Sequence, residues 1–189
     1  MRVAIISLLA LILASCGVLQ QVTIREDEIG VVYDTLTDEL QLPLPPGTHF
    51  VDLMTQSITI YPTFFQNYTF SQETADAALT ISAPPIRGLN GEGVQIEAAL
   101  SVVFRIVPEQ INQIHAAWLN ESGDYRSGYI RPVTSAVVRD VMNDYTGAQL
   151  RDMDYDVLDE ILRARLFPEF MQSGFLLDDV RVRDIRVVE

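Results

Sequence analysis

The stretch GVQIEAALSVVFRIV, residues 93–107, decides the fold because its apolar side chains recur at every second position. A period of two places alternate side chains on one face of a β-strand. Gln95, Glu97 and Arg105 point to the other face, which we expect to be in water. A long strand rich in β-branched residues predicts the centre of a sheet that helices cover. The predicted buried face comprises Val94, Ile96, Ala98, Leu100, Val102, Phe104 and Ile106.

Composition narrows the possible partners. The 189 residues are 48% hydrophobic, which is enough for an ordered core. Acidic residues number 26 against 13 basic ones, for a net charge of −13, and every basic residue is an arginine. This charge disfavours nucleic acid and electrostatic binding to anionic lipid, since both need clustered cations. The single cysteine excludes an intrachain disulfide and a thiolate zinc site. We expect no nucleic-acid partner, no metal and no cofactor.

The N-terminus has the composition of an export signal. Arg2 precedes an uncharged apolar run over residues 3–14. The run ends in LASC, which resembles the lipobox of bacterial lipoproteins. The resemblance implies that the signal is cleaved before Cys16 and that Cys16 carries the lipid. The alternative is an uncleaved helix over residues 3–19, about 25 Å long against a hydrocarbon core of about 30 Å. Either anchor, residues 1–21, predicts a bacterial membrane location with the folded domain extracytoplasmic, because Arg2 stays inside.

Short strands dominate the region before the central strand. Alternation from residue 22 to residue 33 is broken by an acidic turn at residues 26–28, and LPLPPG, residues 42–47, predicts a stiff loop. Asn90-Gly91 is a good tight-turn pair. Further strands are expected at residues 48–51, 57–61, 64–70 and 78–83. The aromatic residues among them favour strand packing over a ligand platform: Tyr61, Phe64, Phe65, Tyr68 and Phe70.

After Val107 the pattern becomes helical. A first helix is expected to open at Pro108, with Ile111, Ile114, Ala117 and Trp118 on one face. A second covers residues 124–145, bent or restarted at Pro132. A third covers residues 156–173, with an irregularity at Pro168 and a glycine stop at Gly174. Residues 175–188 return to a strand with one slip in its alternation, so the fold class is α+β.

We found no enzyme signature. DMDYD, residues 152–156, begins like a calcium loop, but Val157 stands where its glycine should be and Arg163 where its glutamate should be. These aspartates favour capping of the third helix. His49 and His115 lie outside any nucleophile motif. The glycines of residues 88–93 lead into a strand without a lysine, which disfavours a phosphate-binding loop.

Several sequence segments occur together in one order along the chain. They are EIGVVY at 28–33, PGTHFV at 46–51, residues 91–106 ending in FRI, DY at 124–125, YIRP at 129–132, VRDV at 138–141, residues 145–150, GFLLDDV at 174–180 and DI at 184–185. With these segments the chain resembles the SPFH, or Band 7, domain, and most closely the prohibitin family. The resemblance implies a strand-rich N-terminal subdomain, residues 22–90, and a strand-helix-helix-strand subdomain, residues 91–189.

The resemblance also implies a function. It implies a membrane-bound scaffold that forms homo- or hetero-oligomers with SPFH subunits, organises membrane lipid and protein, and in some members restrains a membrane protease. It carries over no catalytic residue. Two features depart from the family pattern, the lipobox-like anchor and the end of the sequence at Glu189, where members usually continue into a coiled coil. Such a protein could form a flat ring, cap another family member or be a fragment.

Two hypotheses from different classes follow. The first is the membrane-anchored, oligomeric scaffold, which is not an enzyme. The second is a monomeric extracytoplasmic binding lipoprotein that presents the aromatic strand at residues 64–70 to a ligand. Arg105, on the water-facing side of the central strand, is a candidate contact between subunits or between subdomains.

Overall fold

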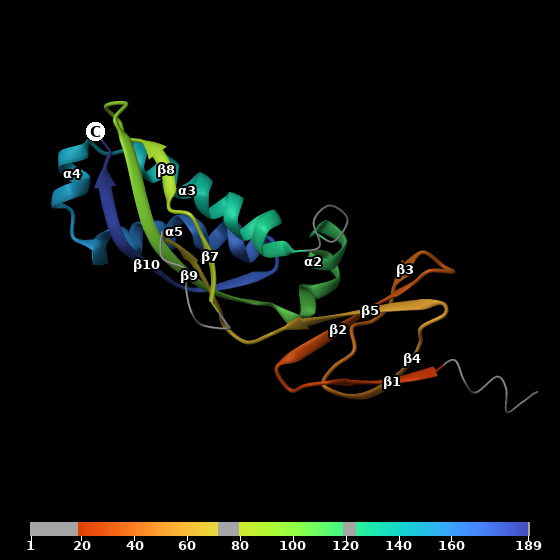
Figure 1. The fold of residues 1–189 in the computed structure, drawn as a ribbon. Helices are drawn as coiled ribbons and strands as arrows, with labels where there is room; N and C mark the ends of the chain where they lie inside the picture. The colour runs from red at the N-terminus through yellow and green to blue at the C-terminus, as the bar shows by residue number, and fades with distance from the viewer. Residues whose placement is uncertain (1–18, 72–79, 119–123, 189) are drawn as a thin grey trace, which may run out of the picture. The chain divides into compact units, whose positions relative to one another are not determined.

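The computed structural model describes residues 19–71, 80–118 and 124–188 (Figure 1). The chain forms two compact units, one up to Thr63 and one from Phe64 onward. The sequence predicted a boundary after residue 90 instead. The observed boundary is earlier because strands β6 (Gln66–Phe70) and β8 (Ile86–Leu89) both pair with the central strand, β9 (Gln95–Ile106).

The first unit, unit 1, is built from two small antiparallel sheets. One pairs β1 (Leu19–Ile24) with β4 (Gly47–Asp52), and the other has the order β3-β2-β5. Strand β2 spans Glu28–Asp34, β3 spans Glu39–Leu40 and β5 spans Gln56–Pro62. The acidic turn at residues 26–28 joins β1 to β2, as predicted. The core of this unit includes Ile24, Ile29, Val31, Val32, Val51 and Tyr61.

The second unit, unit 2, contains a five-stranded sheet with β9 inside it. Strand β9 pairs with β10 (Phe175–Val187) along one edge, and with β6 and β8 along the other. Strand β7 (Thr80–Ala83) lies beyond β6 and parallel to it. The predicted central strand is therefore confirmed. Strand β8 was missed, because only four residues separate Pro84-Pro85 from the turn at Asn90.

The helices of unit 2 differ in detail from those expected. A 3₁₀ turn at Pro108–Gln110 leads into α2 (Ile111–Trp118), and a π-helix at Arg126–Ile130 leads into α3 (Arg131–Asn143). Pro132 restarts the second helix, since proline is tolerated in the first turn. Helix α5 (Tyr155–Gln172) continues through Pro168, where we expected an irregularity.

A short helix, α4 (Gly147–Asp152), was missed by sequence reasoning. The second helix was expected to end at residue 145, and no helix was expected at Gly147, where α4 begins. Thr146 accepts a hydrogen bond from Gln149 N, and Gln149 accepts one from Thr146 N, which makes a reciprocal capping box. The signal was present as Thr-x-x-Gln.

The core of unit 2 lies between the sheet and its helices. Ile96, Leu100 and Val102 on the inner face of β9 are fully buried. Helices α3 and α5 pack beside each other against this face (Figure 1), and a small apolar void between Leu100, Val138 and Leu162 marks the contact. Phe104 continues this face into a cluster of aromatic rings, with ring centroids 5.9 Å apart for Phe104 and Phe175. The cluster comprises Phe104, Tyr125, Tyr129, Phe170 and Phe175.

The outer face of β9 is less open than its sequence predicts. Gln95 and Arg105 are exposed as expected, but only 9% of Glu97 is exposed. Glu97 lies directly opposite Arg87 of β8 and accepts a hydrogen bond from its Nε at 3.2 Å. The expectation was wrong for Glu97 because a cross-strand partner on the missed strand β8 covers it.

The free edge of β10 is covered by side chains of α5. Asp159 Oδ1 accepts a hydrogen bond from Val182 N at 2.6 Å, and the Tyr155 hydroxyl accepts one from Ile185 N at 3.3 Å. Between these amides the pairing with β9 shifts by one residue, which confirms the slip predicted from the sequence. Unpaired edge amides invite another strand to pair with them. Helix α5 therefore blocks β-pairing at these two positions.

We expect the contribution of Asp159 to the free energy of unfolding to depend on pH. Burial raises its pKa, against the opposing effects of the Val182 hydrogen bond and Arg181. A carboxyl whose folded-state pKa is raised loses stability as pH rises through that pKa. Unfolding of Asp159→Asn, which keeps the acceptor without the charge, should therefore be less dependent on pH above about 4, the ordinary pKa of an aspartate. Asp159→Ala, which leaves Val182 N unpaired, should lower the free energy of unfolding by about 1–2 kcal/mol. Urea titrations followed by circular dichroism measure both effects. A larger loss of unfolding free energy in Asp159→Asn than in Asp159→Ala would contradict the role of Asp159 as an acceptor.

Candidate functional site

The predicted lipid-attachment residue, Cys16, lies outside the described residues. Arg105 is described, and it is exposed on the outer face of β9. Its guanidinium lies over the ring of Phe65, 5.1 Å from the centroid. Both residues belong to unit 2, so this cation–π contact is internal to that unit. A contact of Arg105 with another subunit stays a prediction.

Two rings of the aromatic strand, those of Tyr68 and Phe70, are buried. Only 4% of Tyr68 and 1% of Phe70 is exposed. Their ring centroids lie 5.1 Å apart, so the two rings also pack on each other. Phe65 is more exposed, but Arg105 lies over its ring. These rings therefore support strand packing, as the sequence favoured.

The other polar residues singled out in the sequence have structural partners. Asp154 caps α5 by accepting a hydrogen bond from Asp156 N at 3.1 Å, as expected. His49 Nε2 lies 2.7 Å from the carbonyl oxygen of Pro45. Burial lowers the pKa of His115, which lies on α2. Within the described residues, no three histidine, cysteine or acidic side chains form a group that could hold a metal.

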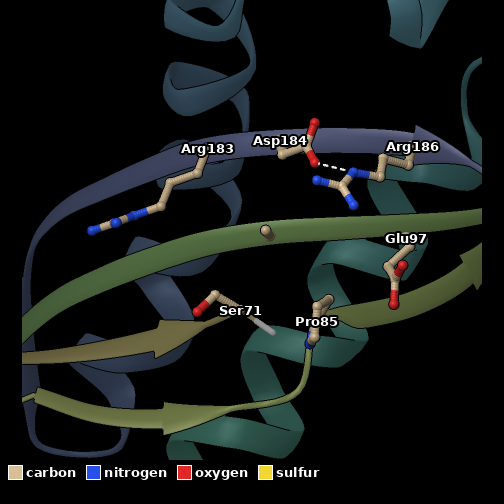
Figure 2. Close-up of a pocket in the computed structure, with 7 residues that line it drawn as sticks. Ser71, Pro85, Glu97, Arg183, Asp184 and Arg186 are labelled. Atoms are coloured by element: carbon tan, nitrogen blue, oxygen red, sulfur yellow. Dashed lines mark ion pairs between the residues drawn. The ribbon is translucent and has the colours of Figure 1, made fainter. Parts of the chain in front are cut away.

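A pocket of about 270 Å³ lies on the outer face of the sheet in unit 2 (Figure 2). Glu97 and Ala99 of β9 and Arg183, Asp184 and Arg186 of β10 line it, together with Ser71 and Pro85. Asp184 forms an ion pair with Arg186, and Glu97 forms one with Arg87. Two arginines and two carboxylates balance in charge along the lining. The pocket therefore has no excess of either sign with which to select a charged ligand.

Unit 1 carries a different feature, an exposed apolar tip. The turn between β2 and β3 carries Leu36, and the turn between β4 and β5 carries Leu53 and Met54. The exposed fractions are 77% for Leu36, 45% for Leu53 and 78% for Met54. Thr35 joins the two turns, because its N and Oγ1 both donate to the carbonyl oxygen of Thr55 at 2.8 Å. Leu36, Leu53 and Met54 together are named the apolar tip.

Aspartates in the two turns hold the apolar tip in place. Asp34 Oδ1 accepts hydrogen bonds from Leu36 N at 2.9 Å and Thr37 N at 3.2 Å. Asp52 Oδ1 does the same for Met54 N at 3.0 Å. Such aspartate turns fold the backbone without using the side chains of the following residues. The turns are thus fixed by acids, and their apolar side chains are left in the solvent.

The N-terminal sequence enters unit 1 beside this tip. Leu19, the first described residue, pairs with Asp52, the residue directly before Leu53. Only four residues, 15–18, separate the uncharged apolar run of residues 3–14 from Leu19. An anchor at Cys16, or in the apolar run, therefore joins unit 1 at the end that carries the apolar tip. Sequence reasoning missed the tip, although apolar residues at turn positions were a visible signal.

Comparison with known families shows which family the chain belongs to. The model of the SPFH domain / Band 7 family matches residues 22–189, which is most of the chain. The chain belongs to the SPFH / Band 7 family, whose members are generally membrane-associated, non-enzymatic scaffolds that typically form oligomers in membranes. The family and the α+β fold expected from the sequence are thereby confirmed. No curated protein matches the chain. Among the described residues, no helix is both long and apolar enough to cross a membrane.

We expect substitutions of Arg105 to separate its internal contact from a contact with another subunit. Arg105→Ala and Phe65→Ala each remove the cation–π contact and should lower the free energy of unfolding by about 0.5–1 kcal/mol. If Arg105 also contacts a neighbouring subunit, only Arg105→Ala reduces the assembled fraction in size-exclusion chromatography. If the assembled fraction is the same for Arg105→Ala and Phe65→Ala, Arg105 contacts only Phe65 and no neighbouring subunit.

Proposed function

We propose that this chain is a membrane-anchored scaffold subunit that oligomerises to organise lipid and protein around it, with its folded domain on the extracytoplasmic side. The anchor in this proposal is lipid on Cys16, after cleavage of the apolar run that precedes it, and Cys16 stands only three residues before Leu19. The apolar tip is the observation that carries the proposal. It lies at the end of unit 1 where the anchor sequence enters, so an anchored chain places Leu36, Leu53 and Met54 next to the membrane.

The size of the apolar tip fits an orienting contact. Burying one such side chain completely contributes about 1.5–3 kcal/mol. Three partly exposed side chains therefore contribute roughly 3–6 kcal/mol, which matches the marginal, reversible binding given by a single lipid chain. The tip alone would not hold the protein on a bilayer. Together with an anchor it would fix how unit 1 stands on the surface.

Charge explains which kind of membrane contact is favoured. The chain has a net charge of −13. Asp34 and Asp52 directly precede the two turns of the tip, and Asp38 lies in one of them. Anionic lipid would repel these carboxylates. We therefore propose an apolar contact with the interface of the bilayer and no preference for anionic headgroups.

The role of the assembly follows from many copies sharing one membrane. Side-by-side copies would surround a patch of lipid and limit which proteins enter or leave it. Restraint of a membrane-bound protease is one form of this role. The alternative, a monomeric binding lipoprotein, is less well supported because Tyr68 and Phe70 are buried.

Fluorescence quenching by brominated lipid tests the membrane contact. The full chain with Leu36→Trp is reconstituted into vesicles of zwitterionic lipid, with the parent chain as the baseline for Trp118. We expect the added emission to be blue-shifted and quenched by brominated acyl chains, because residue 36 enters the interface.

Glu26→Trp is the matched control, since Glu26 is exposed in the turn between β1 and β2, at the opposite end of unit 1 from the apolar tip. Its emission should not be quenched. Equal quenching at both positions, or none at residue 36, would overturn the membrane contact of the apolar tip.

A further inference from the structure

Helix α5 has two apolar faces, and the described part of the chain covers only one of them. Leu158, Leu162, Leu166 and Phe170 face the core and are 0–3% exposed. On the other side, 50% of Val157, 42% of Phe167 and 36% of Met171 is exposed. Apolar residues every three or four positions lie along one side of a helix. We name this side the outer stripe, which comprises Val157, Ile161, Ala164, Phe167, Pro168 and Met171.

Two charged side chains without an ion pair flank the outer stripe. Glu160 and Arg163 are exposed, lie on the same flank one turn apart, and form no ion pair within the described part of the chain. Arg165 on the other flank differs, because it binds Asp140 and Asp144 of α3, both at 2.6 Å. Glu160 and Arg163 are therefore free to pair with another molecule.

The charges beside the outer stripe are complementary to the same charges on a second copy of the helix. When two copies of α5 lie antiparallel, Glu160 of each helix can face Arg163 of the other, which gives two reciprocal ion pairs. Ala164 near the crossing point is small enough to let the helices approach closely. A twofold contact requires that the same patch fits its own copy. A bilayer fits this surface less well, because the charged Glu160 and Arg163 border the stripe.

We propose that the outer stripe of α5 is a contact between two copies of this chain, which pack antiparallel around Ile161 and Ala164. The inference rests on the proposed function, since it names one surface through which the scaffold assembles. A twofold contact closes with two copies. It therefore supplies a dimeric unit, and growth beyond the dimer uses another surface.

The size of the contact fits a membrane-bound protein. The outer stripe runs for 15 residues, about 22 Å of helix. One helix pair of this length buries less than the roughly 800 Å² per partner of a stable protein interface. The contact would be weak between free molecules. It becomes effective when anchors hold the copies at high local concentration in one membrane.

Cysteine cross-linking in the full, membrane-reconstituted chain tests the contact. Ala164→Cys should give a disulfide-linked dimer under mild oxidation, above the level of the parent chain, which contains only Cys16. Glu169→Cys is the matched control, because Glu169 is exposed on the same helix but away from the stripe. It should give no added dimer.

Charge exchange in the Ala164→Cys background tests the predicted pairing. Glu160→Arg alone and Arg163→Glu alone each place like charges opposite one another and should reduce the dimer roughly fivefold, as expected for two exposed ion pairs. The double exchange should restore it. A dimer yield that is the same in all three charge variants as in Ala164→Cys alone would overturn the antiparallel contact.

The outcomes also separate this inference from the proposed function. If the chain forms a large assembly but Ala164→Cys gives no dimer, the α5 contact is overturned and the scaffold remains. If Ala164 is protected from a thiol reagent after substitution to cysteine, yet no dimer forms, a different partner covers the stripe and the contact between copies is again overturned. A chain that is monomeric in membranes overturns both.

Discussion

Burial of the inner face of β9 against α3 and α5 is the interaction on which the rest of unit 2 depends. Strand β9 is paired along both edges, with β10 on one side and with β6 and β8 on the other. Its inner side chains, from Ile96 to Ile106, are almost fully removed from water. Each such side chain contributes about 1.5–3 kcal/mol relative to an exposed one. Because one strand brings these segments together, losing its packing would release the sheet and both helices.

The two units expose apolar surface in different ways. Unit 1 holds its apolar side chains outward on turns that aspartates have folded, next to the entry of the N-terminal sequence. Unit 2 buries the rings of the aromatic cluster around Phe104 and leaves Val157, Phe167 and Met171 of α5 exposed. Helix α5 also covers the amides of Val182 and Ile185 at the edge of β10. Association through strand pairing is thereby blocked at these amides, and helix packing is favoured.

Periodic segments were predictable from the sequence, and features set by distant partners were not. The alternation of residues 93–107 gave the central strand, and the broken alternation after Val182 gave the slip in β10. The boundary after Thr63 depends on β6 and β8 joining β9, which no local pattern encodes. Burial of Glu97 likewise depends on Arg87 across the strand pair. The apolar tip was missed because exposure of Leu36 and Met54 is set by turn geometry.

The number of copies in one particle tests the central claim most directly. The full chain is extracted from membranes in mild detergent, and its mass is measured by mass photometry and its symmetry by electron microscopy. A membrane scaffold predicts symmetric particles of many 21.2 kDa chains. Particles that hold a single chain at every concentration would contradict the account.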